Sequence, residues 1–214
     1  MKRTRLTLLT GLLAWMAAQS FWAQSVWAES DIFVAPFGGY SFGASDLDAT
    51  DIDTNTQGNI SIKDSSHYGI ILGMKTRDPG DVYLLYSHQS TDMHASGMFN
   101  PNRLAKLELD YVHLGGSLYF PKGNLRPYVT VSVGMTQMRP SGDFSDESRF
   151  SMGIGGGVEY LLGDNFSLFA DGRGYATFIN SDNALFCDAN RCIWNIRADI
   201  MWQGQVNAGF KYTF

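Results

Sequence analysis

The sequence predicts an all-β protein, namely an eight-stranded antiparallel up-and-down β-barrel that spans a membrane. Three observations support this: long alternation of apolar and polar residues, connections of alternating length, and a low charge content. Of the 214 residues, 17% are charged, 44% are hydrophobic and 23 are glycine, whereas about a quarter of a soluble domain is charged. This balance excludes intrinsic disorder. The net charge of −5 argues against nucleic-acid binding.

The first 28 residues predict a cleaved secretory signal peptide. Three basic residues lie among the first five, and the apolar core from Leu6 to Ala18 has 13 residues, fewer than the ~20 of a membrane-spanning helix. Val26 to Ala28 ends in the small residue typical of a cleavage site. We expect a barrel domain at residues 29–214 with a net charge of −8, because three positive charges are removed. An uncleaved anchor is the alternative.

Period-two alternation predicts the strands. From Phe150 to Leu162 and from Trp202 to Phe214, alternate residues are mostly large and apolar, and the residues between them are mostly small or polar. This period places the two sets on opposite faces of a strand, and neither segment has the spacing of an amphipathic helix. By this criterion we expect strands near 32–42, 66–76, 82–90, 106–120, 127–138, 149–162, 166–178 and 195–214.

The predicted connections differ in length by position. Those at 77–81, 121–126 and 163–165 are short and rich in turn-forming residues. The others are longer and polar, at 43–65, 91–105, 139–148 and 179–194. Short turns at one end and long loops at the other are typical of transmembrane barrels. An even strand number then places both termini at the short-turn end, which we expect to be periplasmic.

The composition of the two strand faces predicts lipid outside the barrel. In the last three predicted strands the apolar face carries no charge, whereas a water-exposed face is normally rich in charged residues. Aromatic residues gather beside the short turns, as at a membrane interface: Tyr160, Phe166, Tyr212 and Phe214. A soluble lipocalin-like barrel is the alternative, because its strands alternate too.

The opposite face predicts a polar lumen. Its charged residues are Glu108, Asp110, Glu159, Asp171, Arg173, Arg197, Asp199 and Lys211. Buried charges must be paired or hydrated, and eight strands leave an interior that side chains just fill. We therefore expect a polar network that closes the lumen. A narrow selective channel for small or hydrophobic solutes, similar to OmpW, is the alternative.

The chain resembles a known family. The last residues, Phe210–Phe214, carry aromatics at Phe210, Tyr212 and Phe214 and resemble the C-terminal assembly signal of Gram-negative outer-membrane proteins. The segments Phe33–Tyr40, Tyr86–Gln89 and Tyr111–Gly116 are similar to stretches of the OmpA-like, or "porin family", small outer-membrane β-barrel domains. The resemblance covers essentially the whole mature chain.

This resemblance implies insertion by the outer-membrane assembly machinery and contact with outer-membrane lipid and lipopolysaccharide. It implies no single activity, because family members serve as anchors, adhesins, narrow pores and lipid-active enzymes. No cell-wall-binding domain is expected after the barrel. We expect a monomer with a structural or surface-interaction role and no catalytic activity.

One motif offers a catalytic alternative. His88-Gln89-Ser90 resembles the His-x-Ser arrangement of barrel-borne lipid A deacylases, in which serine attacks an acyl ester and histidine takes its proton. Such a site needs a carboxylate that orients the histidine, and Glu108 on the adjoining predicted strand is the candidate. Thr91 follows Ser90 where that family has asparagine, so we favour a structural role for these residues.

No pattern predicts a metal or a cofactor. The first long connection has an acidic run that suggests calcium: Asp46, Asp48, Asp51, Asp53 and Asn55. An EF-hand starting at Asp51 needs glycine and glutamate where Thr56 and Ile62 stand, so at most weak cation binding near lipopolysaccharide remains open. The four histidines have no metal-ligand spacing: His67, His88, His94 and His113. The four glycines of the segment Gly153-Ile154-Gly155-Gly156-Gly157 lie inside a predicted strand, so packing explains them better than nucleotide binding.

The two cysteines, Cys187 and Cys192, lie in the fourth long connection. An exported chain passes through an oxidising compartment, so we expect a disulfide between them. Metal binding would need further ligands, and no histidine lies nearby.

Overall fold

The computed structural model describes residues 32–43, 47–51, 57–97, 103–141, 146–179, 185–187, 192–196 and 200–214. The chain divides into two compact units, Met1–Asp31 and Ile32–Phe214, and the described residues all belong to the second. The predicted signal peptide therefore lies outside the described residues. The described part contains no helix that is long and apolar enough to cross a membrane.

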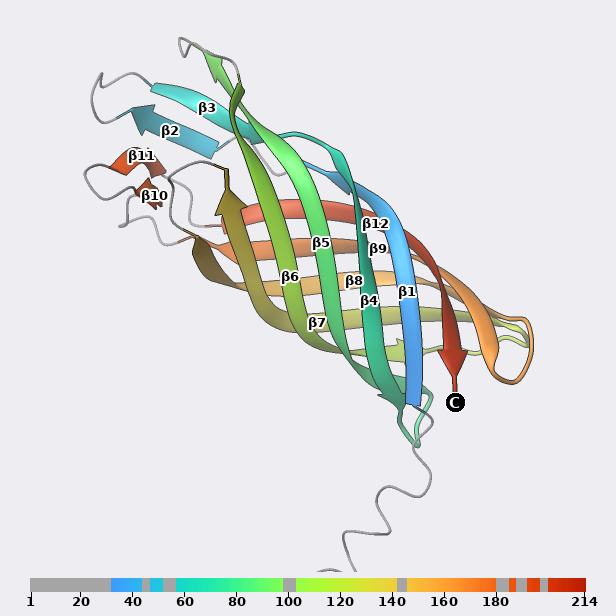
Figure 1. Ribbon diagram of the computed structural model, residues 1–214. Helices are drawn as coiled ribbons and strands as arrows, with labels where there is room; N and C mark the ends of the chain where they lie inside the picture. The colour runs from blue at the N-terminus through green and yellow to red at the C-terminus, as the bar shows by residue number, and fades with distance from the viewer. Residues whose placement is uncertain are drawn as a thin grey trace, which may run out of the picture. The chain divides into compact units, whose positions relative to one another are not determined.

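Eight long strands make up the barrel (Figure 1). They are β1 (Ile32–Phe42), β4 (Ser65–Lys75), β5 (Gly80–Gly97), β6 (Arg103–Tyr119), β7 (Leu125–Pro140), β8 (Glu147–Leu161), β9 (Phe166–Phe178) and β12 (Ile200–Thr213). Each is antiparallel to its neighbours along the chain, and β1 pairs with β12. The barrel is thus closed, which confirms the predicted fold class.

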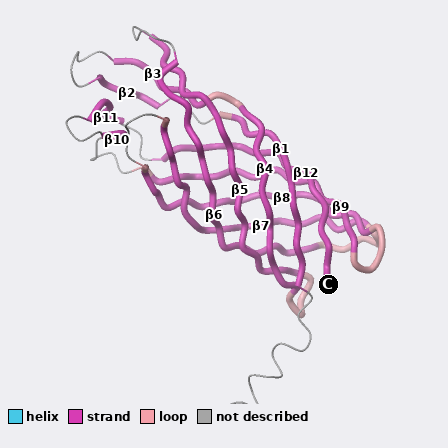
Figure 2. The backbone as a smooth tube through the Cα atoms, in the orientation of Figure 1, coloured by secondary structure: helices cyan, strands magenta, loops and turns pink. Residues whose placement is uncertain are grey.

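The register of the ladders fixes the strand tilt. Following paired residues once around the barrel, from Ile32 through the other seven strands, leads back to β1 at Phe42, ten residues further along. For eight strands this shift corresponds to a tilt of about 40° from the barrel axis, within the range of membrane barrels. The tilt is visible in Figure 2.

Four short strands occupy connections that were predicted as loops. They are β2 (Leu47–Asp51), β3 (Gln57–Ile62), β10 (Leu185–Cys187) and β11 (Cys192–Ile196). Strand β5 is also longer than predicted, because its last residues pair with β3. Strands β2 and β3 are largely polar, whereas β10 and β11 are apolar but only three and five residues long, which is too short to show a clear period of two. The predicted last strand at 195–214 joined the end of β11 to β12, which begins at Ile200.

The three short turns lie together at the opposite end from these strands (Figure 1). Residues 121–126 form the tightest turn, in which Lys122 and Leu125 exchange backbone hydrogen bonds of 2.8 and 3.3 Å. Gly123 between them has a φ of 63°, a conformation that glycine adopts at little cost. At the same end, the Phe214 amide donates to the Ile32 carbonyl at 2.9 Å and joins the last residue to the first strand.

The outer face of the barrel is apolar, and its large side chains are exposed. Leu114 and Ile154, for example, have 64% and 65% of their surface exposed. Toward the long loops this apolar belt ends between two adjacent rows of paired residues. The last apolar row is Tyr86, Val112, Met135 and Phe150, and the first polar row is His88, Asp110, Gln137 and Ser148. A belt with such an edge suits a lipid bilayer.

Closure of the barrel predicts heat-modifiable electrophoretic migration. A closed sheet has no edge strand from which unfolding can start, so unheated protein in mild detergent should stay folded and migrate differently from boiled protein. Identical migration of both samples, with solubility in the absence of detergent, would instead support the soluble lipocalin-like alternative.

Candidate functional site

Besides a small group that links His113, Ser132, Thr136, Ser151 and Thr177, the described part of the lumen holds three groups of hydrogen-bonded polar side chains. The first, the short-turn cluster, comprises Asp81, Tyr119, Glu159, Ser167 and Lys211. Lys211 Nζ lies 3.3 Å from both Asp81 Oδ2 and Glu159 Oε2 and 2.7 Å from the Tyr119 hydroxyl. Tyr119 donates to Asp81 at 2.7 Å, and Ser167 donates to Glu159 at 2.5 Å. One ammonium group therefore links two buried carboxylates from β5 and β8.

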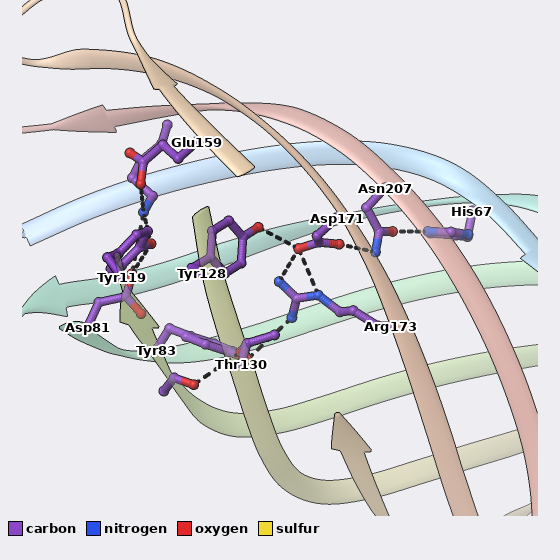
Figure 3. A network of polar contacts seen from close by, with 12 residues as sticks. His67, Asp81, Tyr83, Tyr119, Tyr128, Thr130, Glu159, Asp171, Arg173 and Asn207 are labelled. Carbon is purple, nitrogen blue, oxygen red and sulfur yellow. Dashed lines mark hydrogen bonds and ion pairs between the residues drawn. The ribbon is translucent and has the colours of Figure 1, made fainter. Parts of the chain in front are cut away.

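The second group, the central cluster, is built around the ion pair of Asp171 and Arg173 on β9 (Figure 3). Its members are Ser41, His67, Tyr83, Tyr128, Thr130, Asp171, Arg173 and Asn207. The guanidinium donates to Asp171 Oδ2 through Nε at 3.0 Å and Nη2 at 2.8 Å, and Tyr128 donates to the same oxygen at 2.8 Å. On the other side, Arg173 Nη1 donates to the Tyr83 hydroxyl at 3.3 Å.

A chain of hydrogen bonds that ends on the Asp171 carboxylate also sets the tautomer of the neutral His67 ring. Asn207 Nδ2 donates to Asp171 Oδ1 at 2.7 Å, so the amide oxygen of Asn207 faces His67 Nε2 at 2.5 Å. The ring must donate from Nε2, and its Nδ1 then accepts from Ser41 Oγ at 2.8 Å. This chain of contacts follows the inner wall of the barrel over four neighbouring strands, β9, β12, β1 and β4.

Glycines on β8 make room for the central ion pair. A Cβ at Gly157 would lie 2.5 Å from Asp171 Cβ, and one at Gly155 would lie 2.9 Å from Arg173 Cγ. Both distances are too short for real atoms, so these two positions require glycine. Packing against the ion pair thus accounts for the glycines at 155 and 157.

The third group, the loop-end cluster, lies nearer the long loops and comprises Ser65, Gln89, Tyr111, Tyr175 and Gln203. Tyr111 donates to Gln203 Oε1, Gln203 Nε2 donates to Gln89 at 2.6 Å, and Gln89 Nε2 donates to Ser65 at 2.8 Å. The rings of Tyr111 and Tyr175 meet with centroids 4.7 Å apart. This cluster therefore spans the lumen between β4 and β9.

A small cavity lies between two of these clusters. In the described part of the barrel, the cavity between the short-turn cluster and the central cluster measures about 20 Å³, which is room for about one water molecule. A passage for hydrated ions or solutes would need a continuous space across the barrel.

Four of the predicted lumen residues lie in this interior: Glu159, Asp171, Arg173 and Lys211 are all buried. Glu108 and Asp110 do not, which corrects their prediction. On β6 the inward positions are the odd-numbered ones, such as Tyr111 and His113. The prediction assigned the even-numbered residues of β6 to the lumen, because Leu107 and Leu109 are apolar and looked like residues of the lipid-facing side. Both leucines in fact point inward. Arg197 and Asp199 lie outside the described residues.

Asp110 instead centres a polar cluster on the outer face, at the edge of the apolar belt. Although it points outward, it is only 3% exposed, because Tyr86, His88 and Arg139 cover it. Asp110 Oδ1 accepts from the Tyr86 hydroxyl at 2.9 Å and from His88 Nδ1 at 2.7 Å, and its other oxygen pairs with Arg139. The carboxylate that orients His88 is therefore Asp110 and not Glu108.

Several lumen residues were missed by the sequence analysis. Asp81 was assigned to a turn, and the uncharged members of the clusters, such as His67 and Asn207, carry no charge that marks them. The alternation of inward-facing and outward-facing residues along each strand could have identified them. Tyr83 and Asp81 share the inward face of β5 with Ser87 and Gln89, so extending the alternation by one residue finds Asp81.

The C-terminal aromatics lie on the outer face beside the short turns. Phe210, Tyr212 and Phe214 are 45%, 42% and 71% exposed. Phe210 stacks on Phe166 of β9 with centroids 5.7 Å apart, and Tyr212 contacts Phe214 edge-on. They form part of the aromatic border of the belt.

The two cysteines lie opposite each other in the pair of short strands β10 and β11, where Cys187 is the register partner of Cys192. Directly paired residues of antiparallel strands have Cα atoms about 4.5–5.5 Å apart, a separation that a disulfide can bridge. The backbone register is thus compatible with the predicted bond, which stays a prediction.

Among the described residues, no group of three or more histidine, cysteine, aspartate or glutamate side chains could hold a metal ion. The acidic run in the first long connection falls largely outside the described side chains.

Three solved structures share this architecture. The outer membrane protein OprG from Pseudomonas aeruginosa is 15% identical, with a TM-score of 0.59, and the match covers 87% of this chain and 97% of that one. Neisserial surface protein A is 14% identical with a TM-score of 0.56, over 86% and 97% of the two chains. The outer membrane protein AlkL is 14% identical with a TM-score of 0.54, over 87% and 91%. At these identities the similarity shows the fold alone.

No curated protein sequence matches the chain significantly. The family model for the outer membrane protein beta-barrel domain matches residues 6–214, nearly the whole chain. The closed eight-stranded barrel, its apolar outer belt and its polar interior agree with that match. The chain therefore belongs to the outer membrane protein beta-barrel domain family.

Proposed function

We propose that this outer-membrane barrel has a structural or surface-interaction role, carried by its long-loop end, and that it neither transports solutes nor catalyses a reaction. The observation that carries this proposal is the crowded polar lumen, in whose described part the cavity between the short-turn cluster and the central cluster measures only about 20 Å³. The same observation argues against the narrow selective channel. We propose that the barrel is a monomer that contacts outer-membrane lipid and lipopolysaccharide. During insertion its partner would be the outer-membrane assembly machinery.

The long-loop end supports an interaction role because its backbone forms a sheet. Strand β3 pairs with the far end of β5, β2 pairs with β3, β11 with β2, and β10 with β11. The first and fourth long connections are thereby joined, although they lie far apart in the sequence. A paired backbone holds a surface in one shape, which lowers the entropy cost of binding a partner.

A deletion strain tests this role. It is complemented with the full chain, with a variant in which short turns replace residues 44–62 and 180–199, or with a control shortened at residues 142–145 of the third long connection. When the three proteins reach equal levels in the outer membrane, we expect the full chain and the control to restore the detergent resistance of the cells and their attachment to surfaces. The variant that lacks residues 44–62 and 180–199 should restore neither. Full restoration by that variant would contradict a role of the loops.

We further propose that the chain reaches the outer membrane through a signal peptide cleaved after Ala28. We also propose that Cys187 and Cys192 form a disulfide. The intact mass of the purified protein tests both, because it should correspond to residues 29–214 less two hydrogen atoms. A mass that includes residues 1–28 would contradict cleavage.

The disulfide should shape the loop and should not be needed for the barrel. So short a loop contributes roughly 2 kcal/mol of chain entropy. We expect Cys187→Ser with Cys192→Ser to insert normally but to be cleaved faster by protease added outside the cell. Failure of the double variant to insert, or two thiols that label readily in the native protein, would contradict this.

A lipid A-modifying enzyme is the second candidate function, favoured by one observation. His88 and Ser90 share the outer face at the edge of the apolar belt, and Asp110 orients the His88 ring at 2.7 Å. Two observations argue against it. Arg139 and Tyr86 also bind the Asp110 carboxylate, and among the described residues no hydrogen bond joins Ser90 to His88. Histidine must reach the hydroxyl to take its proton.

Ser90→Ala separates the two candidates. We expect lipid A of the deletion strain, and of that strain complemented with wild type or with this variant, to have the same acylation by mass spectrometry. Loss of one acyl chain with the wild type, abolished by Ser90→Ala, would overturn the non-catalytic proposal.

A further inference from the structure

The short-turn cluster and the central cluster approach each other in the lumen but share no direct hydrogen bond. Within the first, contacts run between Asp81, Tyr119, Glu159 and Lys211; within the second, they run from Tyr83 through Arg173 and Asp171 to His67. Figure 3 shows the two groups side by side with no dashed line from one to the other. Between them lies the cavity of about 20 Å³.

Polar groups of both clusters line this cavity. Asp81, Glu159 and Lys211 come from the short-turn cluster, and Tyr83 and Arg173 from the central one. Apolar side chains, Ala35 among them, complete the wall. A volume of about one probe sphere with several polar partners is what a buried water molecule requires.

One atom at this place lacks a partner. Asp81 is 4% exposed, and its Oδ1 is buried without any hydrogen bond, whereas Oδ2 binds Tyr119 and Lys211. A buried carboxylate oxygen left without a donor is costly. Among the lumen groups with an unpaired atom, Asp81 is the one that lines this cavity.

We propose that the cavity binds one structural water molecule, which donates to Asp81 Oδ1 and accepts from the Arg173 guanidinium. Arg173 suits this role because its Nη1 has only the long 3.3 Å contact to Tyr83. The bound water satisfies the open carboxylate oxygen and joins the two clusters into one network that spans the lumen from β1 to β8. The water molecule is therefore part of the polar network that closes the lumen.

A small cation is the other ligand to consider, because the short-turn cluster has two carboxylates and one lysine. Water fits better, since Arg173 and Lys211 both line the cavity and would repel a cation. The two ligands differ in their response to salt. A sodium site makes stability depend on sodium, and a water site leaves it equal in sodium, potassium and choline chloride of one ionic strength.

Two substitutions at Ala35 test the proposal, because this fully buried residue lines the cavity. Ala35→Val fills the space with carbon and expels the water. Ala35→Ser places a hydroxyl there that can donate to Asp81 in its stead. We expect the thermal unfolding midpoint in detergent to fall for the valine variant and to stay near wild type for serine. Ala170→Val adds the same carbons on the exposed face of β9 and should change little.

An empty cavity gives the opposite order, with valine stabilising and serine destabilising, and that result would overturn the proposal. Direct detection complements the midpoints, in case both variants fold poorly. A high-resolution crystal structure of the wild type should show one density peak within hydrogen-bond distance of Asp81 Oδ1 and Arg173. No peak there, or sodium-dependent stability, would equally refute a water site.

Discussion

Deletion of Phe214, or its replacement by aspartate, should sharply lower the amount of barrel in the outer membrane and leave degraded protein in the periplasm. The last strand must close the barrel against β1, where the Phe214 amide bonds to Ile32, and it carries the aromatic ending that resembles the assembly signal. Cell fractionation, with heat-modifiable migration as the test of folding, measures the loss.

The matched control is Phe120→Asp. Phe120 lies at the same end of the barrel and is 50% exposed, so it carries the same cost of a charge at the membrane border. We expect Phe120→Asp to retain much more protein in the outer membrane than Phe214→Asp. Wild-type levels of the Phe214 deletion variant would contradict a role of this residue in assembly.

Replacement of Lys211 by methionine should destabilise the barrel strongly. Its ammonium group is the shared partner of Asp81 and Glu159 in the lumen, and removing it leaves two buried carboxylates facing each other. Breaking a buried ion pair in this way costs about 3–5 kcal/mol. Denaturant-induced unfolding of the protein in detergent micelles, followed by the shift from folded to unfolded migration, gives the change.

Lys122→Met serves as the control, because Lys122 is exposed in a short turn and should change stability by less than about 0.5 kcal/mol. A second variant, Lys211→Met with Glu159→Gln, removes one of the stranded charges and should recover part of the loss. Equal stability of Lys211→Met and wild type would show that the short-turn cluster does not hold the lumen together.

The barrel strands can be predicted from the sequence for a physical reason. Lipid outside and a narrow lumen inside impose opposite chemistry on alternate residues, so strands such as β1 and β9 were predicted with their observed bounds. Outside the membrane this constraint is absent. Strands β2 and β3 are largely polar, and β10 and β11 are apolar but very short, so none of the four shows a long apolar–polar alternation and they were predicted as loops.

The candidate site was predicted in part. The alternation of apolar and polar residues correctly placed four charged residues in the lumen, because it is regular in their strands: Glu159, Asp171, Arg173 and Lys211. It failed on β6, where inward-facing Leu107 and Leu109 made the lumen face look like the lipid face. The partners of these charges come from strands distant in sequence, as in the contact of Lys211 with Asp81, and depend on the register that brings β5, β8 and β12 around one lumen.

The closed lumen is the central claim, and ion conductance of the purified wild-type protein in planar lipid bilayers tests it most directly. With folding verified by heat-modifiable migration, we expect no discrete current steps, because the three clusters fill the space that hydrated ions would need. Reproducible single-channel steps from the folded wild-type protein would contradict it.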